Sequence, residues 1–362
     1  MRGAKRGIVA TLIALSAVST AVTAAQAQQA KTQGHWAMEI HGGAGVIERA
    51  KLGPAGEAAY RAALKQALAA GTAVLARGGS SMDAVEAAIR VMEDDPHFNA
   101  GRGAVFTEQG KNEMDAAIMD GATERAGAAA DVTRTRHPIS LARAVMEKTP
   151  HVMLVGPGAD AFSAQAGLEQ VDPSFFFTES RWDSLVKQLQ KEGKPVPPRP
   201  AGAPPPGAIE PVAVYDETPG QGNYGTVGAV ALDVNGNIAA GTSTGGMQGK
   251  MPGRVGDSPI IGAGTYASNH SCAVSATGSG EYFIRLTVAR DICALVEYEG
   301  MKLSDAVNEI IHKQLPAIHG DGGVIAITPD GQMAWSFNTP GMFRARQVEG
   351  GPVEVGIYND EP

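Results

Sequence analysis

The feature that most constrains the fold of this chain is a proline-rich segment near its middle. Residues 193–225 are rich in proline, which excludes a helix or a central strand there and predicts a flexible or polyproline linker on the surface. A run with strand character, Thr226–Asp233, follows directly. The chain therefore divides into two structured halves, and Thr226 stands where the second half begins.

Thr226 could act as a nucleophile at that position, although a threonine in a strand usually has only a structural role. If the Gly225–Thr226 bond breaks, Thr226 carries both a hydroxyl group and a free α-amine, and such an amine can activate the hydroxyl as a nucleophile. The reference pKa of an α-amine is about 8, so near neutral pH a useful fraction is unprotonated. Gly225 suits a strained geometry before cleavage because it lacks a Cβ atom.

Both halves of the chain mix helices and strands. Apolar periodicity and capping residues in the first half predict helices at 56–76, 80–94, 138–148 and 157–168 and strands at 36–40, 105–107, 114–119 and 152–155. The second half is predicted to hold strands at 226–233, 237–244, 272–276, 323–328 and 332–337 and helices at 281–298 and 304–314. Asn235-Gly236 and Asp330-Gly331 are hairpin signals. Antiparallel hairpins with paired helices favour an α+β sandwich over a doubly wound parallel sheet.

The first 27 residues have the pattern of a secretory signal peptide. A basic start with Arg2, Lys5 and Arg6 precedes the mostly apolar stretch 8–22, and Ala25-Gln26-Ala27 supplies a cleavage site with small residues. Polar residues interrupt the apolar stretch, which favours export over a membrane anchor. We therefore expect an exported, periplasmic protein with no membrane-spanning segment after residue 27.

The composition excludes several classes of protein. The net charge is −8 at pH 7, which disfavours nucleic acid as a partner. Cys272 and Cys293 are too few for a disulfide scaffold or a cysteine-based zinc cluster, and we expect them to be buried free thiols. The histidines lack the spacing of metal ligands.

Glycine and threonine clusters indicate where an amide hydrolase could stabilise an oxyanion. The segments His41–Gly43 and Thr277–Gly280 can present backbone N–H groups for that purpose. Arg254 and Asp257 lie three residues apart in a loop rich in glycine and proline. Such a pair could bind a zwitterionic amino acid, with Arg254 on the α-carboxylate and Asp257 on the α-ammonium, although a surface ion pair is the commoner role.

Two other classes of protein deserve comparison. Gly241–Gly245 reads GTSTG, which matches the nucleophile elbow of an α/β-hydrolase esterase with Ser243 as the nucleophile. The elbow requires a helix directly after the serine, and the glycines and proline in 245–253 cannot form one. A non-catalytic periplasmic binding protein is the third possibility, but it has no evident need for these glycine clusters.

Several segments together resemble one enzyme family. Residues 225–285, HGGAG at 41–45, FNAGRGAVFT at 98–107 and MDAAIMDG at 114–121 are similar to the isoaspartyl peptidase/L-asparaginase family, the plant-type asparaginases. These are N-terminal nucleophile hydrolases. The resemblance implies a four-layer αββα sandwich and autocleavage at Gly225–Thr226. It also implies an α subunit of residues 28–225, a β subunit of residues 226–362 and a dimer of such αβ units.

The resemblance also assigns roles to residues of this chain. Thr226 would be the nucleophile, Thr244 its hydrogen-bond partner, and Asn99 a neighbour of the scissile bond. Thr277 and Gly278 would bind the developing oxyanion, and the substrate would be anchored by Arg254 and Asp257, with Gly280 nearby. Catalysis would need no cofactor. A structural sodium ion would be held mainly by backbone carbonyls of Met92, Glu93, Asp95, Phe98, Ala100 and Arg102.

The residue before the nucleophile bears on the substrate. Relatives that cleave glycosylated asparagine tend to have aspartate there, whereas this chain has Gly225. The resemblance therefore favours small substrates, namely β-aspartyl dipeptides and L-asparagine, over a glycosylasparaginase-like activity.

Overall fold

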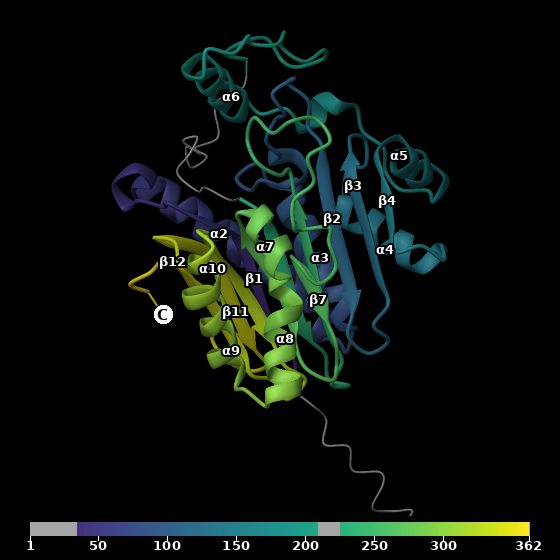
Figure 1. Ribbon diagram of the computed structural model, residues 1–362. Coiled ribbons are helices and arrows are strands. Elements are labelled where there is room, and N and C mark those ends of the chain that lie inside the picture. Colours follow the sequence, from purple (N-terminus) through teal and green to yellow (C-terminus); the bar gives the residue numbers. More distant parts are fainter. Residues whose placement is uncertain (1–34, 209–224, 362) are drawn as a thin grey trace, which may run out of the picture. The chain divides into compact units, whose positions relative to one another are not determined.

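Two stacked β-sheets lie between layers of helices (Figure 1). The computed structural model describes residues 35–208 and 225–361. The predicted signal peptide and the linker residues 209–224 lie outside the described residues. The αββα arrangement confirms the predicted α+β sandwich.

The larger sheet has eight strands in the order β12-β11-β1-β5-β6-β2-β3-β4. Its neighbours are antiparallel except for β3 and β4, which are parallel. The strands are β1 (Ala37–Gly45), β2 (Met114–Asp120), β3 (Ala126–Val132), β4 (Met153–Val155), β5 (Val227–Leu232), β6 (Ile238–Thr244), β11 (Gly341–Val348) and β12 (Glu354–Tyr358).

The smaller sheet is antiparallel and has the order β10-β9-β8-β7. Its strands are β7 (Thr265–Ala267), β8 (Ala273–Gly278), β9 (Gly322–Ile327) and β10 (Met333–Phe337). Both predicted hairpins are present, because β5 pairs with β6 and β9 with β10. Their turn glycines, Gly236 and Gly331, have φ angles of 81° and 87°, which a residue with a Cβ atom rarely adopts.

Three helices pack on the outer face of the larger sheet, namely α2 (Arg49–Leu75), α3 (Ser81–Asp94) and α4 (Pro138–Lys148). The smaller sheet is covered by α8 (Val288–Glu299) and α9 (Leu303–Glu309). Two further helices precede the linker, α5 (Gly156–Gln165) and α6 (Glu179–Lys191), and two flank the α8–α9 pair, α7 (Gly280–Leu286) and α10 (Leu315–Ala317). Short 3-10 turns occupy Gly101–Gly103 and Pro173–Phe176. Ser80, one of two adjacent serines that could cap this helix, caps α3 by accepting a hydrogen bond from Asp83 N.

Strand β5 is buried on both faces because helices cover one face of the larger sheet and the smaller sheet covers the other. Ala229 and Ala231 pack under α2 and α3, whereas Val230 and Leu232 pack between the two sheets. Successive side chains of a strand point to opposite faces, so this single strand contributes to two hydrophobic layers. Thr226 precedes it and is held at the end of a rigid element.

Several predicted elements differ in the structure. The helix predicted at 281–298 breaks at Thr287, whose φ of 50° is left-handed. The helix predicted at 304–314 changes into a π-helix at Ile310–Gln314. Residues 105–107 form no strand, and only an isolated bridge joins Thr107 to Lys250. The described part of the linker, residues 193–208, is irregular as predicted, but Arg199 fixes it to α6 through an ion pair with Glu179.

The two cysteines were predicted to be free thiols, and that prediction is wrong. Cys272 and Cys293 form a disulfide that ties the start of β8 to α8. The pattern of the sequence could not show this pairing, because it depends on α8 packing directly on β8. No helix within the described residues has the length and apolarity that a membrane crossing requires.

Candidate active site

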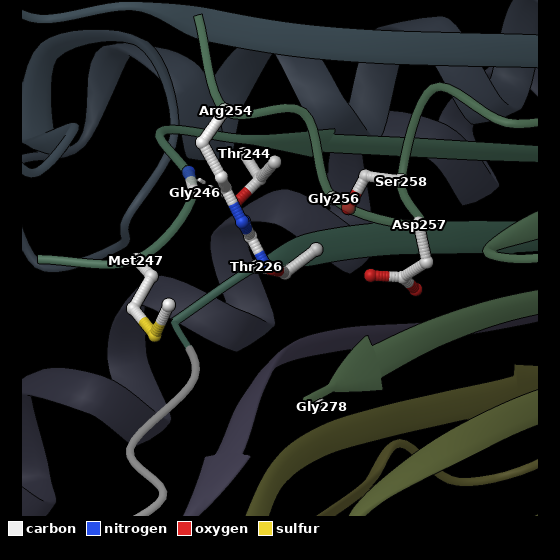
Figure 2. A pocket seen from close by; sticks show the side chains of 9 residues that line it. All are labelled: Thr226, Thr244, Gly246, Met247, Arg254, Gly256, Asp257, Ser258 and Gly278. Atoms are coloured by element: carbon white, nitrogen blue, oxygen red, sulfur yellow. Dashed lines mark hydrogen bonds between the residues drawn. The ribbon is translucent and has the colours of Figure 1, made fainter. Parts of the chain in front are cut away.

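Thr226 lies one residue before β5 and is 7% exposed. Its Oγ1 atom is 3.0 Å from Oγ1 of Thr244, the last residue of β6 (Figure 2). The two residues meet because β5 and β6 are paired with Val227 opposite Ser243. The Oγ1 atom of Thr244 also accepts a hydrogen bond of 2.9 Å from Gly246 N, so its own proton is available to Thr226.

The peptide bond before Thr226 is held by Asn99. The backbone N–H of Asn99 donates to the carbonyl oxygen of Gly225 over 3.1 Å. The Asn99 side chain donates to Gly246 O at 2.7 Å and accepts from Val105 N at 2.9 Å. Asn99 therefore lies beside the Gly225–Thr226 bond, where the resemblance places it, and its backbone N–H polarises the carbonyl that Thr226 would attack.

A small pocket opens in front of Thr226. It lies between the ends of β5, β6 and β8 and the loop that follows β6 (Figure 2). Its lining residues are Thr226, Thr244, Gly246, Met247, Arg254, Gly256, Asp257, Ser258 and Gly278. The pocket thus brings the predicted nucleophile, the predicted substrate anchors and one predicted oxyanion residue together from segments far apart in the sequence.

Arg254 extends toward Thr226 from the loop after β6 (Figure 2). Its guanidinium group is bound through Nε and Nη2 to the two carboxylate oxygens of Glu281, each at 3.0 Å. Glu281 belongs to α7 and its side chain is 54% exposed. The planar fork of Arg254 is therefore set for a carboxylate, and a carboxylate of the protein occupies it in this structure.

Asp257 is buried in the same pocket. Its Oδ2 atom has no hydrogen-bond partner among the described residues. Burial raises the pKa of Asp257 to about 7, although the nearby positive charge of Arg254 partly offsets this effect. A Cβ atom on Gly280 would lie 2.8 Å from Asp257 Oδ1 and 3.0 Å from Arg254 Nη2, so glycine is needed there to leave both anchors in place. An ammonium group beside Asp257 would relieve the unsatisfied carboxylate.

The predicted oxyanion residues end strand β8. Gly278 lines the pocket, and Thr277 precedes it and is almost fully buried. A Cβ atom on Gly278 would lie 2.4 Å from the ring of Phe283 and 2.5 Å from Asp321 O. Only glycine fits at this position, and its backbone therefore reaches the pocket directly.

The second predicted oxyanion segment, His41–Gly43, lies elsewhere. It belongs to β1 and contributes no residue to the pocket lining. His41 instead lies beneath Thr226, and its Nδ1 atom is 3.0 Å from Thr226 O. The elbow serine also points away from the pocket: Ser243 faces α3 and donates to Glu93 Oε1 at 2.7 Å. Residues 245–279 contain no helix, so none directly follows Ser243, which agrees with the rejection of an α/β-hydrolase.

Charged residues beneath the loop were missed by the sequence reasoning. Lys250 is 3% exposed and donates to Glu113 O at 2.7 Å, while Glu113 Oε2 accepts from Gly253 N at 2.9 Å. Asp115 lies opposite Thr244 in the β2–β6 pairing and is fully buried. These contacts anchor the loop that carries Arg254 to the start of β2. The signal in the sequence that could have indicated them is Lys250 itself, a lysine within the glycine-rich segment 245–253.

The segment expected to hold sodium lies at the end of α3. Met92 and Glu93 end α3, and Asp95, Phe98, Ala100 and Arg102 follow in a tight loop. The carbonyl oxygens of Glu93 and Phe98 point at Gly101 and Gly103, at 2.2 and 2.0 Å from where Cβ atoms would be. The Asp95 side chain is already hydrogen-bonded to the ring and the backbone N–H of His97. The oxygen ligands that the loop can offer a hard cation are therefore its backbone carbonyls. Met92 O and Ala100 O also accept turn hydrogen bonds.

Two stacked sheets between helical layers, with a threonine at the head of a central strand, define an N-terminal nucleophile hydrolase. A family model described as asparaginase matches residues 34–357, and the chain belongs to this family. It is 47% identical over 322 residues to an isoaspartyl peptidase of Escherichia coli, covering 89% of this chain and 96% of that protein.

Eukaryotic proteins are similar over about the same share of this chain. A probable isoaspartyl peptidase/L-asparaginase 2 of Arabidopsis thaliana is 42% identical over 90% of this chain and 99% of its own length. An isoaspartyl peptidase/L-asparaginase of Xenopus laevis is 38% identical over 89% of this chain and 95% of its own length. The similarity therefore spans both sides of Gly225–Thr226.

Proposed function

We propose that this protein is an autoprocessing amidohydrolase that cleaves β-aspartyl dipeptides and the side-chain amide of L-asparagine and releases aspartate. The observation that carries the proposal is the placement of one hydroxyl nucleophile and two opposite charges in a single pocket. Thr226 stands beside Arg254, which suits a carboxylate, and Asp257, which suits an ammonium. The names of the relatives support the same substrates.

In the first reaction the chain cuts itself. Thr226 Oγ1 attacks the carbonyl carbon of Gly225, the C–N bond breaks, and an ester joins Gly225 to the threonine oxygen while the nitrogen becomes the α-amine. Water then hydrolyses the ester and leaves a carboxylate on Gly225. The hydrogen bond from Asn99 N to Gly225 O supports this proposal, because it would stabilise the charge that develops on that oxygen.

In the second reaction the new α-amine accepts the proton of the Thr226 hydroxyl, and the oxygen attacks the β-carbonyl of the substrate. The leaving amine departs, a β-aspartyl ester forms, and water hydrolyses it to aspartate. Backbone groups at Thr277 and Gly278 would bind the oxyanion. Thr244 would orient the nucleophile through the 3.0 Å contact between the two hydroxyl groups.

Self-cleavage is tested on the purified protein by intact mass and N-terminal sequencing. The wild type should yield two fragments, of which the smaller begins Thr-Val-Gly-Ala-Val, and Thr226→Ala should stay a single chain. Cleavage that persists in protease-free Thr226→Ala would contradict the assignment of the nucleophile.

The substrate is tested by comparing three compounds at equal concentration. β-Aspartyl-leucine and L-asparagine should be hydrolysed, whereas the α-linked aspartyl-leucine should not, because its α-carboxyl is tied up in the peptide bond and cannot meet Arg254. Arg254→Lys keeps the charge but loses the planar fork, so kcat/KM should fall about ten- to a hundred-fold while self-cleavage continues. Equal turnover of both dipeptides would refute the two-anchor pocket.

Three further properties belong to the proposal. The disulfide supports export to an oxidising compartment such as the periplasm, since disulfides are rare in reducing ones. The carbonyl loop after α3 supports a structural sodium ion that stiffens the segment carrying Asn99. Family membership supports a dimer of αβ units. The mass of the exported protein tests removal of the signal peptide. Unfolding in sodium chloride compared with choline chloride tests the sodium ion, and light scattering tests the dimer.

A further inference from the structure

A buried chain of polar side chains runs beneath Thr226 and joins the two sheets. It begins at the carbonyl oxygen of Thr226, continues through His41 of β1 and Ser275 of β8, and reaches Thr242 of β6. Thr265 of β7 binds Thr242 at 2.7 Å, and its hydroxyl also lies 3.0 Å from the carbonyl oxygen of Ser258. Each of these four side chains is fully buried.

The directions of the hydrogen bonds follow from the chemistry of the partners. A carbonyl oxygen can only accept, so Nδ1 of His41 carries the proton and donates to Thr226 O over 3.0 Å. Burial lowers the pKa of His41 to about 3, so the ring is neutral at physiological pH. Its Nε2 atom then has a lone pair and accepts the hydroxyl proton of Ser275 over 3.0 Å. The carbonyl oxygen of Thr226 thereby fixes the tautomer of His41, and Ser275 holds the ring from its other side.

The glycine two residues after the nucleophile makes room for this arrangement. A Cβ atom on Gly228 would lie 1.9 Å from Ser275 Oγ and 2.3 Å from His41 Nε2. The backbone of β5 can therefore approach the His41–Ser275 pair only because residue 228 has no side chain. In the β1–β5 pairing His41 is opposite Gly228, which brings its ring under the start of β5.

We propose that His41 is a positioning residue that clamps the nucleophile through its backbone carbonyl. The β1–β5 pairing ends at His41 and Gly228, so the carbonyl of Thr226 lies beyond that ladder and His41 supplies a partner. With the carbonyl fixed, rotation about the Cα–C bond of Thr226 is restrained, and Oγ1 stays opposite Thr244. The inference rests on the proposed role of Thr226 as the nucleophile.

The His41 clamp should contribute differently to self-cleavage and to substrate hydrolysis. Before cleavage, Thr226 is held by covalent bonds on both sides. After cleavage it is the first residue of a chain, and terminal residues lose order unless they are tied down. The His41 clamp should therefore matter more for hydrolysis of substrate than for self-cleavage.

Two substitutions separate the clamp from simple filling of space. Asn places an amide nitrogen near the position of Nδ1, so His41→Asn can still donate to Thr226 O. Gln places its amide near Nε2, so His41→Gln reaches Ser275 instead. We expect His41→Asn to keep kcat within about threefold, and His41→Gln to lose about ten- to a hundred-fold in kcat because the nucleophile is misplaced.

The measurements are kcat and KM for β-aspartyl-leucine, with the rate of self-cleavage followed in the same preparations. KM should be unchanged in His41→Gln, because Arg254 and Asp257 are untouched, and self-cleavage should slow less than hydrolysis. His137→Asn, at a buried histidine outside the site, is the matched control and should keep kcat. Equal kcat values for His41→Asn and His41→Gln would overturn the clamp.

A smaller substitution, Ser275→Ala, tests the proposal if the His41 variants do not fold. Ser275→Ala removes only one oxygen and leaves Nε2 of His41 without its partner. The ring is then held from one side only, so kcat should fall with constant KM, and an unchanged kcat would overturn the proposal. The role of Thr226 is checked separately, because activity in Thr226→Ala would refute the nucleophile and not the geometry of His41.

Discussion

A buried carboxylate oxygen without a hydrogen-bond partner destabilises a protein unless a ligand completes it, and Oδ2 of Asp257 is such an atom among the described residues. Its pKa is raised to about 7, so it is half protonated near neutral pH in the free enzyme. Only the ionised form can pair with the substrate ammonium, so substrate capture must weaken as the pH falls through 7. Binding of the ammonium lowers the pKa of Asp257 again, which restricts the effect to the free enzyme.

This gives a prediction for the pH dependence. Two protons must leave the free enzyme, one from Asp257 and one from the ammonium of Thr226, so the acid limb of log kcat/KM should approach a slope of two. In Asp257→Asn the limb should fall to a slope of one and KM should rise. Steady-state kinetics between pH 5 and 9 with β-aspartyl-leucine measure both slopes. The same slope in both proteins would show that Asp257 does not titrate in the reaction.

Glu281 competes with the substrate for Arg254. It is half exposed and occupies the Nε–Nη2 edge of the guanidinium, so it competes for that edge when the α-carboxylate of the substrate binds. Exposed ion pairs contribute about 0–1 kcal/mol, so Glu281→Gln should lower KM by up to about fivefold and leave kcat unchanged. Glu297→Gln, which removes the pair with Arg290, serves as the control. A higher KM in Glu281→Gln would mean that Glu281 aligns Arg254 instead.

At the scale of elements, the disulfide fixes α8 on β8, the strand that carries Ser275, Thr277 and Gly278. The two cysteines are 21 residues apart, and closing a loop of that length stabilises the folded state by about 3 kcal/mol in the chain-entropy description. Replacing both Cys272 and Cys293 by Ala should cost about that amount.

The measurement is denaturant unfolding of Thr226→Ala, which stays one chain, with and without the cysteine substitutions. Reductant should lower the midpoint of the parent protein toward that of the cysteine-free protein and leave the latter unchanged. A stabilising role would be contradicted if the unfolding midpoint of the parent protein did not change with reductant and equalled that of the cysteine-free protein.

At the scale of the whole molecule, the proposed cleavage would not separate two domains. Strand β1, which precedes the linker, lies between β11 and β5, and β2 lies beside β6. Strands from both sides of Thr226 therefore alternate within one sheet, and their separation would break backbone ladders and open the cores on both faces. We expect the two fragments to co-elute in size-exclusion chromatography and to separate only in denaturant. Fragments that part in native buffer would contradict this interleaved sheet after cleavage.

Local signals in the sequence were sufficient for much of the fold. Asn235-Gly236 specified the β5–β6 hairpin, because few other residue pairs adopt its backbone angles. The start of α3 is set by its capping residue Ser80, and the start of α4 by Pro138 in its first turn. Strands β3, β7, β11 and β12 and helix α6 were not predicted, because their patterns are weak and their stability comes from distant neighbours.

The sequence by itself determined the nature and order of the chemical groups: a threonine at the head of a strand, glycines beside it, and an arginine three residues before an aspartate. The tertiary structure alone decided which of these groups meet. Only the pairing of β1 with β5 and the stacking of β8 on them place His41 and Ser275 under Thr226. Only the packing of α8 on β8 joins the cysteines, and only the break at Thr287 separates α7, which carries Glu281, from α8. Contacts between residues far apart in sequence depend on how whole sheets and helices pack, and no short window of residues contains that information.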